Sequence, residues 1–234
     1  STDDLVIDLN DLETAILRTS AKFMMISHMR GHQVDMEKLL KLLSKHQVLL
    51  IEDCAHTMGA SWNNTRSGNF GTVSCFSTQT YKHLNSGEGG LITTNSEAII
   101  ARAIILSGSY MLYHKHILSP EEKFFDTIKF ENPNCSARMD NLRASILRPQ
   151  LRKLNKSIIK WNRRYNLLRD KLSQCEGIYI PARSLKEKFV GSSFQFLVPK
   201  EWSGNRCKSF VQSCFTRGVE LKWFGDLEPL GYTS

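Results

Sequence analysis

The order of apolar and amphipathic segments near the start of the chain is the feature that most constrains its fold. Residues 22–27 (KFMMIS) form a short apolar run that is typical of a buried strand. Residues 35–45 follow with helical spacing, because Asp35 suits a helix N-cap and apolar side chains recur at Met36, Leu39, Leu40 and Leu43. Residues 48–51 are a second apolar run. Strand, helix and strand within about thirty residues predict a parallel βαβ unit.

The following segments extend this pattern. Residues 72–77 and 90–94 are predicted strands, and residues 97–106 a helix. Residues 109–135 show no clean period. We therefore predict an α/β fold with a mainly parallel sheet and crossover helices.

The second half of the chain has a different character. A long helical pattern covers residues 138–172, where Pro149 could break the helix. Short apolar segments and one helix-like segment after it suggest the start of a small α+β unit, at residues 177–181, 193–198 and 206–216. The predicted domains are a large α/β domain (1–137), a connecting helix (138–172) and the start of a small C-terminal α+β domain (173–234).

Charge and composition exclude several classes of protein. The net charge of +8 could favour nucleic acid, but much of it lies in residues 138–169, where basic side chains alternate with apolar ones. A solvated or subunit-facing helix surface explains this pattern better, so we predict no nucleic-acid partner. The sequence has no run of about 18 apolar residues, so no membrane span is expected. Six scattered cysteines without C-x-x-C spacing indicate reduced thiols in a cytoplasmic protein, and no metal site.

Residues whose side chains could take part in catalysis or binding follow the predicted strands. Asp53 and His56 come after one strand, Ser77 after the next, and Lys82 five residues later, before the glycine-rich residues 87–90. Open α/β sheets bind ligands beyond the carboxyl ends of their strands. Each residue also has an ordinary interpretation, such as a helix cap for Asp53, a turn for Ser77 or a solvated charge for Lys82. Their combination is more informative than any one of them.

That combination resembles a known family. The stretches IEDCAHTMGA (51–60) and GNFGTVSCFSTQTYKHLNSGEGG (68–90) closely resemble the DegT/DnrJ/EryC1/StrS family, the sugar-aminotransferase branch of fold-type-I pyridoxal-phosphate enzymes. HMRGHQVDM (28–36) resembles the family's strand-loop-helix entry, and NCSARMDNLRASILRPQ (134–150) the segment that opens its long helix. The resemblance implies that residues 1–137 are the cofactor-binding large domain.

The resemblance also implies roles for individual residues. Lys82 falls on the lysine that holds pyridoxal 5'-phosphate as a Schiff base, and Asp53 on the acid that pairs with the pyridine nitrogen. His56 falls beside the cofactor ring, and Ser77 on a hydroxyl that binds the phosphate. Asn134 is the nearest match to an asparagine that reaches the neighbouring subunit's phosphate. Ser136 is a rival, because three residues separate Asn134 from Arg138 where the family usually has one.

The implied activity is an aminotransferase of nucleotide-sugar biosynthesis. An amino-acid donor, glutamate or glutamine, would supply the amino group to a keto-sugar or cyclitol-like acceptor, in a homodimer with the site at its interface. Dehydratase relatives have histidine in place of the lysine, whereas the count from Ser77 places Lys82 in that position. The alternatives are a non-catalytic or regulatory family member and, from the charge alone, a polyanion-binding module.

The resemblance also raises an expectation about the ends of the chain. Complete family members carry an N-terminal Gly/Thr/Ser turn that binds the cofactor phosphate, and residues 1–22 contain no such turn. We therefore expect the large domain to be incomplete and the chain to be truncated at both ends.

Overall fold

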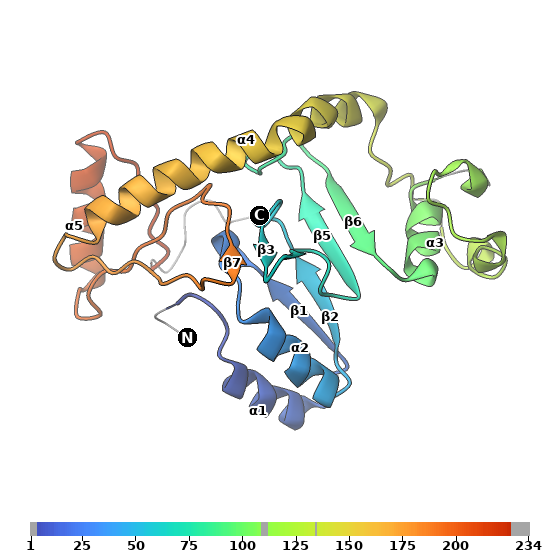
Figure 1. The fold of residues 1–234 in the computed structure, drawn as a ribbon, viewed down its shortest axis with the longest axis horizontal. Coiled ribbons are helices and arrows are strands. Elements are labelled where there is room, and N and C mark those ends of the chain that lie inside the picture. The colour runs from blue at the N-terminus through green and yellow to red at the C-terminus, as the bar shows by residue number, and fades with distance from the viewer. Residues whose placement is uncertain (1–3, 109–111, 134, 226–234) are drawn as a thin grey trace.

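A four-stranded sheet forms the centre of the protein. The computed structural model describes residues 4–108, 112–133 and 135–225 (Figure 1). The strands are β1 (Phe23–Ser27), β2 (Leu49–Asp53), β5 (Val73–Ser77) and β6 (Gly90–Thr94), in the order β1-β2-β5-β6. β1, β2 and β5 are parallel, and β6 is antiparallel to β5. The predicted α/β class and the βαβ unit are both confirmed.

Two helices cover one face of this sheet. α2 (Met36–Lys45) is the crossover between β1 and β2, and the Asp35 carboxylate caps it by accepting a hydrogen bond from the Lys38 amide at 3.1 Å. α1 (Leu9–Thr19), which the sequence analysis did not predict, packs beside α2 (Figure 1). The two helices and the sheet share one core, which includes Ile16, Ile26, Met36, Leu39, Leu43 and Leu50.

The opposite face of the sheet has exposed apolar side chains. Successive residues of a strand point to opposite faces. Phe23 and Met25 of β1 are 65% and 67% exposed, whereas Ile26, which points to the covered face, is buried. Leu49, which pairs with Phe23 in the register of β1 and β2, is 48% exposed. Asp53 lies on the same face as Met25 and Leu49, because all three share one phase of the alternation.

A single long helix passes the carboxyl end of the parallel strands. α4 (Asn141–Leu172) is continuous through Pro149, so the break that proline could have caused does not occur. Its residues Leu147 and Leu154 pack against Leu84, and Met58, Met139, Ile158 and Trp161 surround this cluster. Gly59 allows the close contact: a Cβ atom there would lie 2.6 Å from the Ile158 side chain, and its φ is +91°.

The region after β6 forms a separate apolar cluster. α3 (Glu97–Leu106) contributes Ala101, Ile104 and Ile105, and Phe125 and Ile128 pack against it. The latter two belong to a segment of short 3-10 turns, η2 (Tyr113–Lys115), η3 (Glu122–Phe124) and η4 (Ile128–Phe130). The predicted irregular character of this segment is therefore confirmed for its described residues.

The chain beyond α4 returns to the first half of the molecule. β7 (Glu187–Lys188) joins β3 (Ser61–Trp62) and β4 (Thr65–Arg66) in a small antiparallel sheet. α5 (Gly204–Phe215) is the predicted helix, but the predicted strands at 177–181 and 193–198 are reduced to one antiparallel bridge between Tyr179 and Leu197. The division at residues 137 and 172 stays a prediction. No helix in the described part of the chain is long and apolar enough to cross a membrane.

Candidate functional site

Two neighbouring carboxylates end strand β2, and they point to opposite faces of the sheet. Glu52 lies on the covered face and is fully buried, whereas Asp53 is half-buried on the open face. The two residues therefore have different partners.

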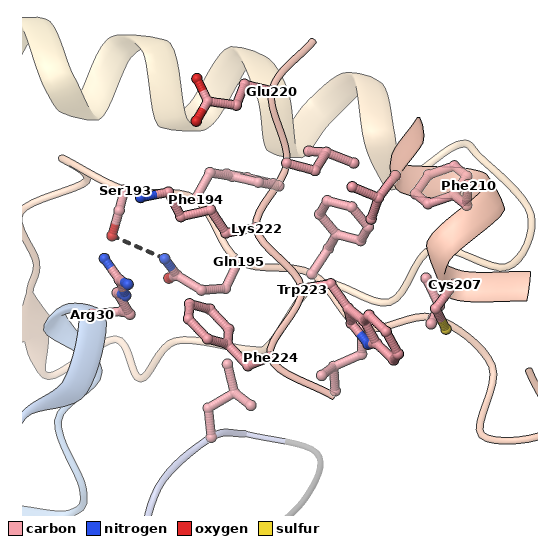
Figure 2. Close-up of a pocket in the computed structure, with 16 residues that line it drawn as sticks. Arg30, Ser193, Phe194, Gln195, Cys207, Phe210, Glu220, Lys222, Trp223 and Phe224 are labelled. Carbon is pink, nitrogen blue, oxygen red and sulfur yellow. Dashed lines mark hydrogen bonds between the residues drawn. The ribbon is translucent and has the colours of Figure 1, made fainter. Parts of the chain in front are cut away.

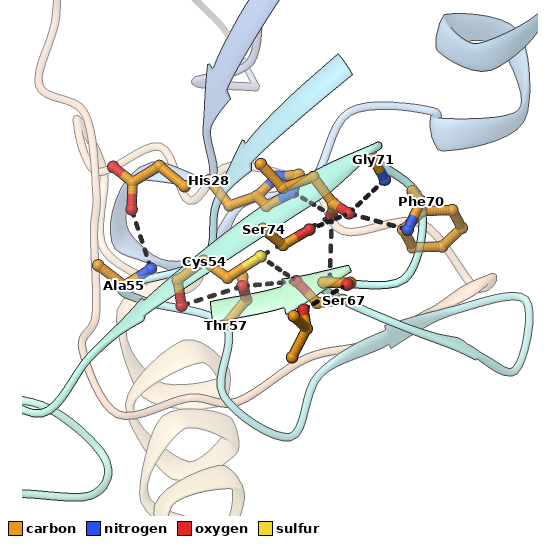
Figure 3. A network of polar contacts seen from close by, with 12 residues as sticks. His28, Cys54, Ala55, Thr57, Ser67, Phe70, Gly71 and Ser74 are labelled. Carbon is orange, nitrogen blue, oxygen red and sulfur yellow. Dashed lines mark hydrogen bonds and ion pairs between the residues drawn. The ribbon is translucent and has the colours of Figure 1, made fainter. Parts of the chain in front are cut away.

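Glu52 is the centre of a buried hydrogen-bond network, and its partners His28, Phe70, Gly71 and Ser74 are labelled in Figure 3. One carboxylate oxygen accepts hydrogen bonds from the amides of Phe70 and Gly71 at 2.8 and 2.7 Å, and from the Ser74 hydroxyl at 3.0 Å. The other accepts from the Gly68 amide at 3.1 Å and lies 3.3 Å from His28 Nε2. Burial alone would raise the pKa of Glu52, but these hydrogen bonds lower it to about 2. The carboxylate thus fixes the loop that leads into β5.

His28, Glu52 and Cys54 are close enough together to be considered as metal ligands. Their potential ligand atoms lie within 4.8 Å of one another, and all three side chains are buried. However, the Glu52 oxygens already accept hydrogen bonds from the loop, and burial raises the pKa of the Cys54 thiol to about 12. The three side chains contact one another and their neighbours through hydrogen bonds, so we describe the cluster as a hydrogen-bond network.

Asp53 is held at the edge of the open face. The Ser27 hydroxyl at the end of β1 donates to Asp53 Oδ2 at 2.8 Å, and the Ala55 amide donates to Oδ1 at 3.0 Å. Both bonds come from residues at the carboxyl ends of adjacent parallel strands, which is where the sequence predicted a site. The carboxylate is oriented but keeps room to accept a further hydrogen bond.

Lys82 and His56 are in direct contact. Lys82 Nζ lies 3.1 Å from His56 Nε2. Burial, followed by the positive charges of Lys82 and Arg30, lowers the pKa of His56 to about 4, so its imidazole is neutral near pH 7. Burial and Arg30 lower the pKa of Lys82, and the negative charge of Asp53 opposes them. The amine of Lys82 is therefore more readily deprotonated than that of a surface lysine.

A cavity of about 560 Å³ opens beside this pair. It is lined by His56 and Lys82 together with Met29, Arg30, Gln79, Tyr81, His83, Trp161, Ser192, Ser193 and Lys222. His83 Nε2 lies 2.7 Å from the Ser192 hydroxyl and its ring packs on Trp161, so the wall joins the β5–β6 loop, α4 and the segment after β7.

The remaining predicted residues are placed less closely together. Ser77, at the end of β5, is half-buried, and its hydroxyl accepts a hydrogen bond from the Gln79 amide at 3.2 Å. Asn134 lies outside the described residues. Its rival Ser136 is exposed in the segment that precedes α4. The contact that either residue would make with a second subunit stays a prediction.

Comparison with known proteins identifies the family. The model of the DegT/DnrJ/EryC1/StrS aminotransferase family matches residues 1–226. This chain belongs to that family. The resemblance seen in the sequence motifs is thereby confirmed across nearly the whole chain.

Two curated relatives and one solved structure are similar to this chain. A GDP-perosamine synthase of Vibrio cholerae is 32% identical over 67% of this chain and 39% of its own length. A putative L-glutamine:3-amino-2,3-dideoxy-scyllo-inosose aminotransferase of Micromonospora echinospora is 39% identical over 46% of this chain and 25% of its own length. The solved structure of the Escherichia coli GDP-4-keto-6-deoxy-D-mannose-3-dehydratase with bound hydrated PLP has a TM-score of 0.80 at 23% identity, over 94% of this chain and 57% of that one. These matches span well under two thirds of the relatives' own lengths.

Several residues around the cavity were not foreseen from the sequence. Arg30, Trp161, Ser192 and Lys222 come from segments far apart along the chain. His83, which directly follows Lys82 in the sequence, also lines the cavity. The signal for Glu52 was present in the E-D pair that ends β2, since a buried strand ending in two acids requires a partner for at least one of them.

Proposed function

We propose that this chain carries the catalytic site of a pyridoxal 5'-phosphate-dependent aminotransferase. It moves an amino group from an amino-acid donor to a keto-sugar or cyclitol-like acceptor. The observation that carries the proposal is the contact of Lys82 Nζ with His56 Nε2 at 3.1 Å, in a cavity at the carboxyl end of the strands that present Asp53 and Ser77.

The residues present fit the cofactor. Lys82 offers an amine of lowered pKa for covalent attachment, and Asp53 an oriented carboxylate for the pyridine nitrogen. His56 supplies an imidazole at the same edge, and the Ser77 hydroxyl suits a phosphate oxygen. When bound, the cofactor supplies an electron sink for the charge that develops on the substrate carbon.

The protein residues supply proton transfer and orientation. A neutral Lys82 amine can remove a proton from the carbon of the donor that bears its amino group, and can return one to the acceptor. The contact with His56 holds the amine of Lys82 toward the cavity. The negative charge of Asp53 would keep a proton on the pyridine nitrogen of the bound cofactor, which would stabilise the negative charge that develops on the substrate carbon.

The names of the relatives support the substrate class. The Vibrio cholerae relative is named for a nucleotide-linked amino sugar, and the Micromonospora echinospora relative for a glutamine donor and a cyclitol acceptor. We extend the proposal to a homodimer in which Asn134 or Ser136 of one subunit contacts the cofactor phosphate of the other.

The test is transfer of isotope from an amino donor. The cofactor-loaded protein is incubated with ¹⁵N-labelled glutamate or with glutamine labelled at the α-amino group, and with a panel of keto-sugars and keto-cyclitols. We expect labelled amino product with at least one acceptor, and its loss in Lys82→Arg. Lys41→Arg, at an exposed position on α2, is the matched control and should retain full transfer. Cofactor loading through Lys82 without any transfer would favour a non-catalytic or regulatory member of the family.

A further inference from the structure

The loop between β5 and β6 carries Lys82 and is closed at its base by backbone hydrogen bonds. In this loop (residues 78–89), the Thr78 amide donates to the Gly89 carbonyl at 2.9 Å, and the Ser86 amide donates to the Thr78 carbonyl at 2.9 Å. Lys82 lies in the part of the loop that these bonds enclose. The position of its amine therefore depends on what holds the enclosed residues against the rest of the protein.

Helix α4 holds the residues that follow Lys82. Leu84 is 2% exposed and packs against two leucines of α4. The main chain of Asn85 is bound by Gln150 of the same helix: the Asn85 amide donates to Gln150 Oε1 at 2.9 Å, and Gln150 Nε2 donates to the Asn85 carbonyl at 2.6 Å. Gln150 Nε2 also donates to the Ile146 carbonyl of its own helix at 3.1 Å, which orients the side-chain amide.

This pair of hydrogen bonds requires a particular side chain at position 150. The backbone of Asn85 presents one donor and one acceptor, and a side-chain amide offers one of each in return. A glutamate would place a second acceptor against the Asn85 carbonyl, and an aliphatic residue would bind neither group. Gln150 and Asn85 are 65 residues apart along the chain, so their contact fixes the loop relative to α4.

The loop has another attachment through His83. Its Nε2 atom lies 2.7 Å from the Ser192 hydroxyl. The next residue, Ser193, lines a second cavity of about 610 Å³ beside α5 (Figure 2). This attachment therefore joins the loop to a segment that borders two cavities, whereas Leu84 and Gln150 join it to a continuous helix. The contacts with α4 are the firmer support.

We propose that Gln150 is a positioning residue for the amino transfer: it holds the loop against α4, so that Lys82 Nζ stays at the cavity in contact with His56. This inference rests on the proposed function, because it concerns the placement of Lys82 for that reaction. Asn85 is three residues from Lys82, so a shift of Asn85 away from α4 also moves the amine. A displacement of about 1 Å at a reacting group can lower a rate by about 100-fold.

The same contact affects the protonation of Lys82. Burial is the main cause that lowers the pKa of Lys82, so a loosened loop that exposes the amine raises this pKa toward its ordinary value. Charged or titratable groups surround Lys82 from several elements, namely Asp53 of β2, Arg30 of the 3-10 turn η1 (Met29–Gly31), His56, Tyr81, His83 and Lys222. α4 contributes the uncharged Trp161 to this lining. Gln150 is also uncharged, so its replacement by leucine acts on the pKa through burial.

The test begins with the full chain before cofactor is added. The variants are Gln150→Leu and Gln150→Glu, and Asn155→Leu, at an exposed position on α4, is the matched control. In Gln150→Leu we expect hydrogen exchange at the Asn85 amide to be faster by about 10-fold. Acetic anhydride labelling of Lys82 at a series of pH values, mapped by mass spectrometry, should show a higher pKa for its amine. Gln150→Glu keeps the acceptor for the Asn85 amide and should show smaller changes, and Asn155→Leu none.

Kinetics of the cofactor-loaded protein complete the test. In Gln150→Leu we expect kcat to fall by about 10- to 100-fold with little change in KM, and the acidic limb of the pH profile to move to higher pH. A lower melting temperature with unchanged kcat and unchanged labelling of Lys82 would show a purely structural role and overturn the proposal. Unchanged exchange at Asn85 would do the same. If the unaltered protein transfers no amino group, the proposed function fails, and the exchange and labelling results still decide whether Gln150 positions Lys82.

Discussion

The two faces of the central sheet differ at adjacent residues of one strand. Glu52 points into the covered face and accepts hydrogen bonds from the loop that leads to β5. Asp53 points to the open face and is oriented by Ser27 and Ala55 beside Lys82. Glu52 fixes the loop beside the site, and Asp53 is the acid to which we assign the proposed chemistry.

This difference shows that a single sequence motif can combine two physical functions. The E-D-x-A-H motif includes both acids and His56, and resemblance alone does not separate the residues that stabilise the fold from those that act on a ligand. The alternation of a β-strand does separate them, because it sends neighbours to opposite faces. The comparison predicts that changes on the open face reduce activity, whereas changes on the covered face reduce stability.

Asp53→Asn is expected to have the largest effect. The substitution keeps the shape of the side chain and removes its negative charge, so amino transfer should fall by at least about 100- to 1000-fold, as for other lost electrostatic groups in active sites. Thermal stability should change little, because Asp53 is half-buried at the sheet edge. Steady-state kinetics and thermal unfolding measure the two effects. Asp11→Asn, exposed on α1, is the control, and near-normal turnover in Asp53→Asn would refute the role.

Glu52→Gln should give the opposite result. The side-chain NH₂ group of glutamine would face the N–H and O–H donors of the loop, where the carboxylate of Glu52 accepts hydrogen bonds. The free energy of unfolding should therefore fall by about 2–4 kcal/mol. Chemical denaturation measures this loss. Glu37→Gln is the control: Glu37 accepts a hydrogen bond from Asn63 on the exposed surface, and its substitution should change stability far less. Equal effects of the two substitutions would contradict the assignment of Glu52 to the folded framework.

Acid should destabilise the protein through three neutral histidines. Burial is the main cause that lowers the pKa of His32, His56 and His83 to about 4 in the folded state. Between about pH 6.5 and 4 the unfolded chain binds more protons, so stability falls as the pH decreases, by about 1–3 kcal/mol in total after screening by solvent. Denaturation at a series of pH values tests this. His32→Asn should reduce the slope, and an unchanged slope would exclude its contribution.

Ser77→Ala should have the smallest effect of the four. Loss of one hydroxyl from the proposed phosphate contact should weaken cofactor binding by about 5- to 10-fold. Titration of the protein with cofactor, followed by its visible absorbance, measures the change. Ser145→Ala, at an exposed position on α4, provides the control, and equal affinity of the two variants would remove Ser77 from the site.

The spacing of apolar residues along the chain predicted several of the helices and strands. The βαβ unit and α4 follow from the spacing of apolar residues. The places of Asp53, Ser77 and Lys82 after strands only marked them as candidates, and their proposed roles come from the resemblance to the family. α1 was also within reach, because Asp8 precedes Leu9, Leu12 and Ile16 at helical spacing.

The features that escaped prediction depend on contacts between distant segments. His83 meets Ser192 and Arg183 meets Gly31 across more than a hundred residues, and no local pattern records such pairs. The antiparallel direction of β6 is likewise not predicted by its sequence, because a run of five residues does not specify the direction of the strand with which it pairs. The polar cavity was therefore predicted on its Lys82 side and missed on its Arg30 and Lys222 side.

The most direct test of the account is the position of the covalently bound cofactor. The protein is loaded with pyridoxal 5'-phosphate, reduced with borohydride to make the attachment permanent, digested, and mapped by mass spectrometry. Lys82→Arg is the matched control. The account predicts a pyridoxyl group on Lys82 in the unaltered protein and none at that position in the variant. A stoichiometric label on another lysine, or no label, would contradict the account.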